Sequence, residues 1–576
     1  LNLCSSGMVN AVEAGFAARD QAPMAGAGSH GVAAHMQHSD RAGLLYALAG
    51  FCTLSIGDAI IKGMAGEWPA TAMATTRYVV GTMLLSVLIV RYYGFAALAL
   101  LTAAGTLVSG AVNYNATTRQ ASFVPTAALA AGATYTATLK GGATDPRIKD
   151  AAGNALAQDV SWGFTTAAAG GGTGGCTAPA NATVAENCLA GNPASEWDIT
   201  GAGDLSIQGY ATQISVNRGS SVGFKVSTNA SNYRFDIYRL GYYGGLGARK
   251  VASVNPTASL PQNQPACLND AATGLIDCGN WATSGSWTVP ADAASGIYVA
   301  KVIRADTGGA SHIVFVVRND ASTADVLFQT SDTTWQAYNN YGGNSLYTGS
   351  PANRAYKVSY NRPFNTRVVD NGQDWLFNSE YPMLRWLEAN GYDVTYASGV
   401  DVDRAGSLLL NHRTFLSVGH DEYWSGAQRT NVEAARNAGV NLAFFSGNEI
   451  FWKTRWENST DGSATPYRTL VCYKETTAGA KIDPTAAWTG TWRDPRFSPP
   501  ADGNRPENAL SGTIFMVNDG ATTSLVVPAA DGKMRFWRNT SIATLAAGTS
   551  TSLPNGTLGY EWDIDADNGF RPAGLV

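Results

Sequence analysis

The chain has few charged residues for its length, and this scarcity narrows the range of its partners. Aspartate, glutamate, lysine and arginine make up 14% of the 576 residues, the net charge is −5, and no basic block is present. A nucleic-acid-binding surface needs clustered lysine and arginine, so we expect no nucleic acid as a partner. Uncharged polar residues and 63 glycines must cover much of the surface, a composition typical of β-sandwiches with many turns.

Several common catalytic signatures are missing from the sequence. It contains no HExxH pair, no Walker loop and no Gly-x-Ser-x-Gly turn. These absences disfavour a zinc protease of the HExxH type, a nucleotide enzyme and a serine hydrolase. The seven cysteines also lack the spacing of a structural zinc site, in which about two to four residues separate paired ligands.

Four of the cysteines form two locally spaced pairs, Cys176 with Cys188 and Cys267 with Cys278. Each pair encloses a short polar loop, which favours two disulfides, each contributing about 3 kcal/mol in a chain-entropy treatment. Four free buried thiols are the alternative. Disulfides persist in oxidising compartments, so we expect an extracytoplasmic protein, secreted or displayed on the cell surface.

The N-terminal part of the chain is unlike the rest. Residues 1–40 are small and polar and are expected to form a disordered leader. Two apolar stretches, Ala42–Gly66 and Pro69–Val90, are each long enough to cross a bilayer of about 30 Å. They predict an apolar helical hairpin over residues 41–98, with membrane anchoring through residues 42–90. The hairpin resembles the opening helices of drug/metabolite transporters, which implies an anchor at most.

Short β-type runs follow the apolar hairpin. The run Thr134–Leu139 and the closing phrase Trp162–Thr166 resemble bacterial Ig-like modules, so residues 99–167 are expected to form a partial Ig-like spacer. Residues 168–175 are glycine-rich and predict a flexible linker. From Cys176 onward, short alternating strands separated by turn residues predict a β-sandwich over residues 176–322.

The hydrophobic pattern changes near residue 323, where continuous apolar runs begin to alternate with helical segments. This alternation predicts a doubly wound α/β domain over residues 323–576, similar to amidotransferase-like domains. The expected strands are Val326–Thr330, Val394–Ala397, Thr414–Val418 and Asn441–Ser446, and the expected helices are Tyr381–Asn390 and Ser425–Ala438.

Polar residues follow three of the expected strands, in Trp335–Gly343, Gly419–Trp424 and Gly447–Trp452. In open parallel sheets, ligands bind beyond the carboxyl ends of the strands, so these loops are candidates for a common site. An extended backbone directs His420 and Glu422 to one side and the residue between them to the other. A metal site, a general acid–base pair and a structural salt bridge all remain consistent with this pair.

The order of motifs from Cys176 to the C-terminus resembles the large-subunit family of N,N-dimethylformamidase. The phrases that carry the resemblance are Glu380–Glu388, Gly419–Trp424, Ser446–Glu449 and Gly559–Asp563. It implies a metal-dependent, amidase-like hydrolase that cleaves a C–N amide bond through metal-activated water. It also implies a mononuclear iron, ferric in character, held by Glu422, Tyr341 and Tyr298.

The same resemblance places His420, Asn448 and Glu561 in the pocket as catalytic residues. Glu561 or His420 would transfer the water proton to the leaving amine, and Asn448 would orient the amide or stabilise the oxyanion. The expected partner is a small-molecule amide or a larger substrate with a C–N bond. An oligomer or an additional small subunit remains open. The alternative function is a non-catalytic secreted or surface protein that binds carbohydrate or another polymer.

Overall fold

The computed structural model of this protein describes residues 98–165 with short gaps, and residues 176–496, 504–518, 520 and 522–573. The predicted leader, most of the apolar hairpin and the linker lie outside these residues. Within the described part of the chain, no helix is long and apolar enough to cross a membrane. Contacts divide the chain into two units, residues 1–166 and 167–576. The predicted boundary between a β-sandwich domain ending at residue 322 and an α/β domain beginning at residue 323 stays a prediction.

The first unit is built from short antiparallel strands. β1 (Leu98–Thr102), β4 (Thr134–Leu139) and β5 (Val160–Thr165) form one sheet, in the order β1-β4-β5. β2 (Gly110–Asn115) pairs with β3 (Gln120–Pro125) in a hairpin. Phe123, Tyr135 and Leu139 of these strands form a small apolar core with Leu156, which lies between β4 and β5.

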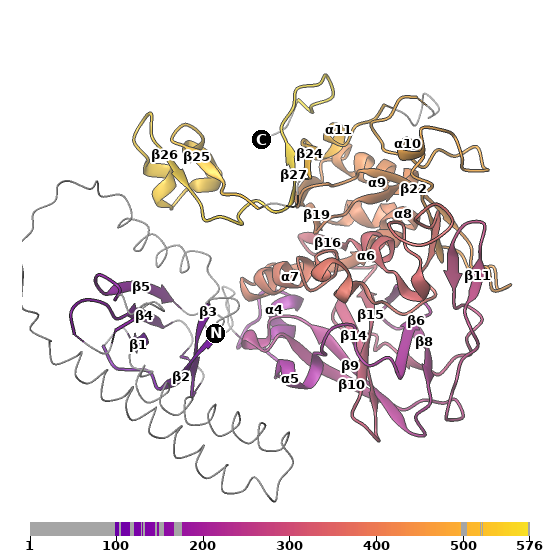
Figure 1. The fold of residues 1–576 in the computed structure, drawn as a ribbon, viewed down its shortest axis with the longest axis horizontal. Helices are drawn as coiled ribbons and strands as arrows, with labels where there is room; N and C mark the ends of the chain where they lie inside the picture. Colours follow the sequence, from indigo (N-terminus) through magenta and orange to yellow (C-terminus); the bar gives the residue numbers. More distant parts are fainter. Residues whose placement is uncertain are drawn as a thin grey trace, which may run out of the picture. The chain divides into compact units, whose positions relative to one another are not determined.

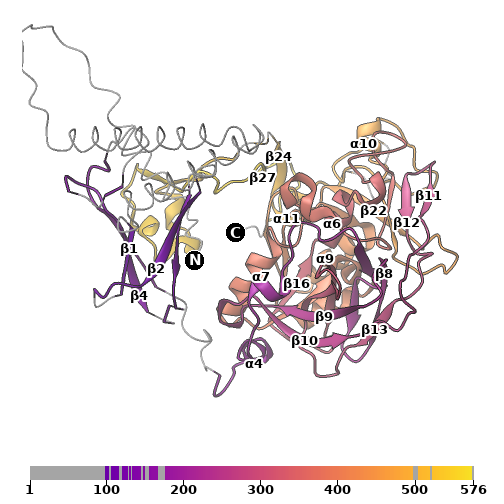
Figure 2. The same cartoon turned by 60° about the horizontal axis from the view of Figure 1, so that its bottom comes forward.

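The second unit contains the expected β-sandwich, which is made of a five-stranded and a three-stranded sheet (Figure 2). Phe224 from the smaller sheet packs against Phe235 and Phe315 from the larger one, with ring centroids 5.0 and 5.8 Å apart. The larger sheet runs β10 (Ala248–Val254), β9 (Tyr233–Leu240), β14 (Gly296–Arg304), β15 (Ala310–Arg318) and β7 (Ser215–Asn217). The smaller runs β13 (Gly285–Thr288), β8 (Ser221–Thr228) and β6 (Ile207–Ala211).

A parallel sheet of four strands follows the sandwich (Figure 1). Its strands are β16 (Val326–Thr330), β18 (Val394–Ser398), β19 (Thr414–Val418) and β21 (Asn441–Phe445), in the order β18-β16-β19-β21. All three neighbouring pairs are parallel. These four strands therefore lie where the sequence pattern predicted them, within one residue at each end.

The two faces of the parallel sheet have different covers. Leu327 and Phe415 on one face pack in a core with residues of α8 (Gly399–Arg404) and α9 (Gly426–Asn437). Phe328 and Leu416 on the other face share a core with side chains of β14, β15 and α7 (Glu380–Ala389). In a doubly wound domain helices cover both faces of the sheet, whereas here a sheet of the sandwich packs against one face. The predicted doubly wound, amidotransferase-like domain is therefore not supported.

The reason lies in β14 and β15 of the sandwich, whose side chains are buried on both faces. Ile297 and Val299 of β14 pack toward the parallel sheet, whereas Tyr298 and Ala300 pack inside the sandwich. Because its outward side chains are apolar, this sheet can cover one face of the parallel sheet without a second layer of helices. The result is a β-rich protein with few helices.

The remaining strands form small sheets around this core. One mixed sheet runs β17 (Lys357–Ser359), β23 (Thr469–Val471), β22 (Trp452–Glu457) and β20 (Tyr423–Ser425). The pairs are β11 (Leu268–Asp270) with β12 (Leu275–Asp277), β24 (Ile514–Asn518) with β27 (Glu561–Ile564), and β25 (Val526–Pro528) with β26 (Ser550–Ser552).

The other helices of the second unit are short. The α-helices are α4 (Ala182–Asn187), α5 (Ala194–Trp197), α6 (Asp332–Tyr338), α10 (Glu475–Ala478) and α11 (Asn508–Ser511). The 3-10 turns are η2 (Tyr243–Gly245), η3 (Tyr341–Gly343), η4 (Thr366–Gly372), η5 (Gly406–Asn411), η6 (Asp531–Lys533), η7 (Arg535–Trp537) and η8 (Ser541–Thr544).

Both predicted disulfides are confirmed. Cys176 is bonded to Cys188 and Cys267 to Cys278, whereas Cys472 is a buried free thiol. Two disulfides that close loops in one chain indicate an extracytoplasmic protein.

Candidate functional site

Loops at the carboxyl ends of two parallel strands bring four of the predicted site residues together. His420 and Glu422 follow β19, Asn448 follows β21, and Glu561 begins β27. Asn448 donates from Nδ2 to Oε2 of Glu561 over 2.9 Å, and Nδ1 of His420 lies 3.4 Å from the same oxygen. The strand order therefore brings together one cluster of polar side chains from three distant segments of the chain, which we call the Glu422 cluster.

His420 is held in the neutral form by its surroundings. Its Nδ1 lies 2.9 Å from the carbonyl oxygen of Gly447, so Nδ1 carries the proton and donates it there. Its Nε2 is then free to accept from the hydroxyl of Tyr560, 3.2 Å away. Burial lowers the pKa of His420, against the opposing charge of Glu561, which also favours the neutral ring.

Glu422 lies among tyrosine side chains. The hydroxyl of Tyr347 donates to its Oε1 and Oε2 over 2.9 and 3.1 Å, and the hydroxyl of Tyr423 donates to that of Tyr347 over 2.6 Å. The ring of Tyr338, the last residue of α6, stacks on Tyr347 with centroids 4.1 Å apart. Burial raises the pKa of Glu422 to about 7, and the charge of Glu561 adds to this rise.

Lys474 lies beside the Glu422 cluster, and the sequence did not indicate it. Its Nζ lies 3.4 Å from the centroid of the Tyr347 ring and 4.8 and 5.5 Å from the centroids of Trp452 and Tyr423. Burial lowers its pKa to about 8, although the charge of Glu422 opposes the shift. Lys474 follows β23 and belongs to no recognisable motif. Only the fold shows that its ammonium group lies above the ring of Tyr347, whose hydroxyl contacts Glu422.

Asp374 is a second residue that the sequence did not indicate. Its side chain is 7% exposed, and its Oδ2 has no hydrogen-bond partner within the described structure. Burial raises its pKa to about 8, and the charges of Glu422 and Glu561 contribute to this shift. The charge of Glu561 raises the pKa of both Asp374 and Glu422, whereas the charge of Lys474 lowers that of Glu422, so a positive charge is stabilised among these carboxyl groups.

The side chain of Asp421 points away from those of His420 and Glu422, as the alternation of an extended backbone predicts. It is fully buried and accepts hydrogen bonds from Gln329 and from the hydroxyl of Ser417. The same hydroxyl lies 3.2 Å from Oε2 of Glu449. Asp421 therefore belongs to a buried polar network with Gln329, Ser417 and Glu449, which supports the loop on which His420 and Glu422 lie.

The structure does not bring Tyr298 or Tyr341 to Glu422. Tyr298 is in the core of the sandwich, where its hydroxyl donates to the carbonyl of Ala294 over 2.7 Å. Its alternation along β14 directs it inward between the two sheets, away from the parallel sheet. Tyr341 packs beside the Cys267–Cys278 disulfide. The tyrosines around Glu422 are Tyr347, Tyr338 and Tyr423.

The described residues contain no group of three or more histidine, cysteine, aspartate or glutamate side chains arranged to hold a metal ion. A metal at Glu422 would therefore need tyrosine oxygens among its ligands. Tyr338 and Tyr347 stack on each other beside Glu422. Burial raises the pKa of both tyrosines, and the charge of Glu422 raises it further. Such a set of oxygen atoms suits a hard cation.

Comparison with known families gives two matches. Residues 234–576 match the family model described as N,N-dimethylformamidase beta subunit-like, C-terminal, and residues 84–166 match that of a bacterial Ig-like domain. Neither match supports the resemblance to transporter helices. No curated protein matches the chain at a significant level.

One solved structure in the comparison is SGBP-B of the Bacteroides ovatus mixed-linkage glucan utilization locus, in complex with a mixed-linkage heptasaccharide. It is 12% identical, and the alignment covers 41% of this chain and 40% of that chain with a TM-score of 0.12. At this TM-score the likeness supports neither a fold nor a function for this protein.

Proposed function

Because the chain belongs to the N,N-dimethylformamidase beta subunit-like family, we propose that it is an amide hydrolase whose active site is the Glu422 cluster. The observation that supports this proposal most is the meeting of His420, Glu422, Asn448 and Glu561 from three separate segments. Family membership suggests the class of reaction, and the geometry suggests which residues perform it.

In the proposed reaction, Glu561 is the group that moves the proton. Its Oε2 accepts from Asn448 and its Oε1 accepts from Asn518 over 3.0 Å, so two side-chain amides orient the carboxylate. Glu561 accepts a proton from water as the water oxygen attacks the amide carbon. It then donates this proton to the nitrogen as the C–N bond breaks, which gives a carboxylic acid and an amine.

Asn448 is proposed to orient the substrate amide. Its backbone has a left-handed conformation, with φ of 58°, and its N–H donates to Oδ1 of Asp563 over 2.6 Å. Its Oδ1 is buried without a hydrogen-bond partner in the described part of the protein. A buried unpaired acceptor costs free energy, and the N–H of a bound primary or secondary amide would satisfy it.

We also propose that the protein binds iron, but with two tyrosine ligands other than those that the sequence resemblance implied. We place a mononuclear iron at Glu422, with Tyr338 and Tyr347 in the positions that the sequence resemblance gave to Tyr298 and Tyr341. The fit rests on the raised pKa of Glu422 and the unpartnered oxygen of Asp374, since both would be stabilised by a cation nearby. When bound, ferric iron would polarise the amide carbonyl and acidify a water molecule.

Metal analysis and amide hydrolysis by the purified full chain test this proposal. We expect near-stoichiometric iron, a tyrosinate-to-iron absorption band, and hydrolysis of at least one amide in a panel that includes N,N-dimethylformamide. Glu422→Gln is expected to lose the iron and the band, whereas the matched exposed variant Glu196→Gln keeps both. The proposal fails if the wild-type protein holds no iron and hydrolyses none of the amides.

A further inference from the structure

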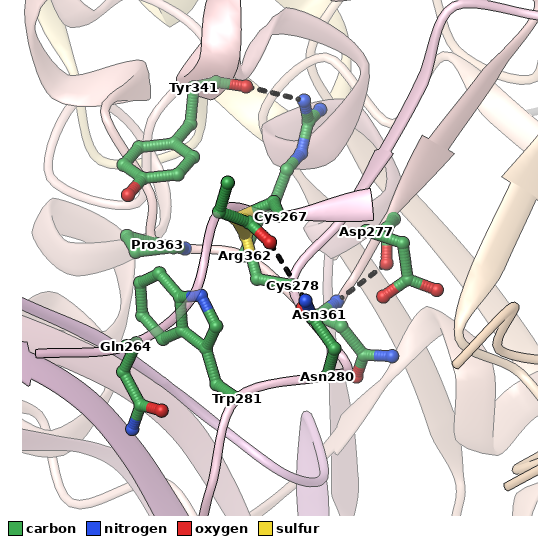
Figure 3. Close-up of a disulfide and its surroundings, with 12 residues drawn as sticks. Gln264, Cys267, Asp277, Cys278, Asn280, Trp281, Tyr341, Asn361, Arg362 and Pro363 are labelled. Atoms are coloured by element: carbon green, nitrogen blue, oxygen red, sulfur yellow. Dashed lines mark hydrogen bonds between the residues drawn. A yellow bond between two sulfur atoms is a disulfide. The ribbon is translucent and has the colours of Figure 1, made fainter. Parts of the chain in front are cut away.

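A separate pocket of about 410 Å³ opens beside the Cys267–Cys278 disulfide. Its walls come from the segment before this disulfide, from the β11–β12 hairpin and from Trp281 and Tyr341. Figure 3 shows the rings of Tyr341 and Trp281 on one side of the disulfide, with Gln264 beside Trp281. The lining of this pocket includes neither Glu422 nor Glu561, nor His420 or Asn448, so it is distinct from the proposed active site.

The lining of this pocket is polar but uncharged. No aspartate, glutamate, lysine, arginine or histidine lines it. An ionic ligand would lose hydration on entry and find no opposite charge to replace it, so the pocket favours a neutral ligand. Its volume lies within the range of roughly 300–1,000 Å³ that is usual for small-molecule sites.

Neutral hydrogen-bonding groups of the pocket are available to a ligand. The hydroxyl of Tyr341 is half-buried and makes no hydrogen bond to any other described residue. The amide of Asn269 is exposed on β11, and its side chain likewise has no partner among the residues that the structure describes. Each of these groups can both donate and accept a hydrogen bond, as the hydroxyl groups of a ligand would require.

The aromatic walls are fixed before any ligand arrives. The indole of Trp281 donates to the carbonyl of Pro265 over 2.9 Å. The amide of Gln264 bridges the backbones of Val226 and Ala282. A rigid aromatic wall loses little conformational entropy on binding, which favours affinity for a small ligand.

The backbone of Tyr341 is also held in place. The buried guanidinium of Arg362 donates to the carbonyls of Tyr341 and Asn344 over 3.1 and 2.8 Å. Gly342 has φ of 80°, and a Cβ at this position would come within 2.8 Å of Ile276, so only glycine allows this close approach. The structure thus builds a fixed surface from elements of the sandwich and of the loop after α6.

We propose that this pocket binds a neutral carbohydrate of one or two sugar units. A pyranose presents an apolar C–H face that can pack on the partly exposed ring of Tyr341, which stands on a base formed by the buried Trp281, and it presents hydroxyl groups that can pair with the Tyr341 hydroxyl and the Asn269 amide. The combination of fixed rings, neutral hydrogen-bonding groups and no charge favours this class over ionic or purely apolar ligands. This inference does not depend on the amide hydrolase proposal.

Isothermal titration of the full chain with cellobiose, maltose, xylobiose and chitobiose tests the inference. We expect at least one disaccharide to bind with a millimolar or lower Kd. Tyr341→Ala is expected to weaken that binding at least tenfold. Tyr341→Phe, which keeps the ring, and Asn269→Ala should each weaken it about twofold to tenfold, the range for one neutral hydrogen bond.

Matched controls separate this site from general damage. Tyr392→Ala removes another partly exposed tyrosine, 44% exposed and outside the pocket, and should leave binding unchanged. Thermal unfolding of each variant shows whether it folds, and if Tyr341→Ala does not fold, Tyr341→Phe and Asn269→Ala decide the question. The inference is overturned if none of the four disaccharides binds at a sugar concentration of about 20 mM, which is twenty times a millimolar Kd. It is also overturned if the folded pocket variants bind with the same affinity as the wild type.

Discussion

A buried ion pair joins the sandwich to the helix that covers the parallel sheet, and its disruption tests whether they unfold together. Arg239 on β9 donates to Oε1 and Oε2 of Glu388 on α7 over 2.8 and 3.1 Å. The side chains are 1% and 0% exposed. Glu388 also accepts from the hydroxyl of Tyr396 and from Nδ2 of Asn187, each over 2.8 Å. The perturbation is Glu388→Gln.

The expected cost follows from the burial of the arginine. Burial by itself would lower the pKa of Arg239, and the charge of Glu388 raises it well above its usual value, so the guanidinium remains charged. Glutamine has nearly the same shape as glutamate but no charge, and its amide group donates where the carboxylate accepted. Removing one partner of a buried ion pair typically costs about 3–5 kcal/mol, and we expect Glu388→Gln to lower the free energy of unfolding by that amount.

Urea unfolding measured by circular dichroism and tryptophan fluorescence is the assay. Asp325→Asn is the matched control, since Asp325 pairs with Arg413 over 3.2 Å on the surface, with side chains 58% and 83% exposed. Its effect is expected to stay below about 1 kcal/mol. The two probes should give the same transition for residues 167–576. The reasoning is refuted if Glu388→Gln costs no more than Asp325→Asn.

Three further predictions follow from other buried groups. Burial lowers the pKa of His312 to about 4, so between pH 6.5 and 4 the unfolded chain binds a proton that the folded chain does not. The free energy of unfolding should therefore fall by about 3 kcal/mol as the pH falls through this window, and urea titrations of His312→Gln should lack this component. Lys474→Met should lower amide hydrolysis at least tenfold, because the cation beside Glu422 is lost; equal activity to the surface variant Lys140→Met would contradict this. Replacing both Cys267 and its partner by serine opens a disulfide with a sequence separation of 11, which should cost about 3 kcal/mol in urea unfolding, and an unchanged midpoint would argue against that contribution.

Local patterns in the sequence were sufficient for several features. The short spacings within the cysteine pairs indicated both disulfides. The continuous apolar run Val326–Thr330 and the helical stretch that ends near Gly391 predicted β16 and α7 within about one residue. The alternation of an extended backbone separated Asp421 from His420 and Glu422, because successive side chains point to opposite sides whatever the rest of the fold does.

Contacts between distant segments depended on the tertiary structure alone. Local sequence did not show which tyrosines lie beside Glu422, and only the packing of β14 between two cores shows that Tyr298 faces the sandwich interior. Lys474 reaches the ring of Tyr347 across more than a hundred residues of chain, which no local pattern encodes. Residue periodicity determines which side chains are buried, whereas the order and packing of the sheets determine which buried side chains meet. For this reason the sequence predicted Glu422 and its neighbours in the motif, and the fold decided which tyrosines and which cation surround it.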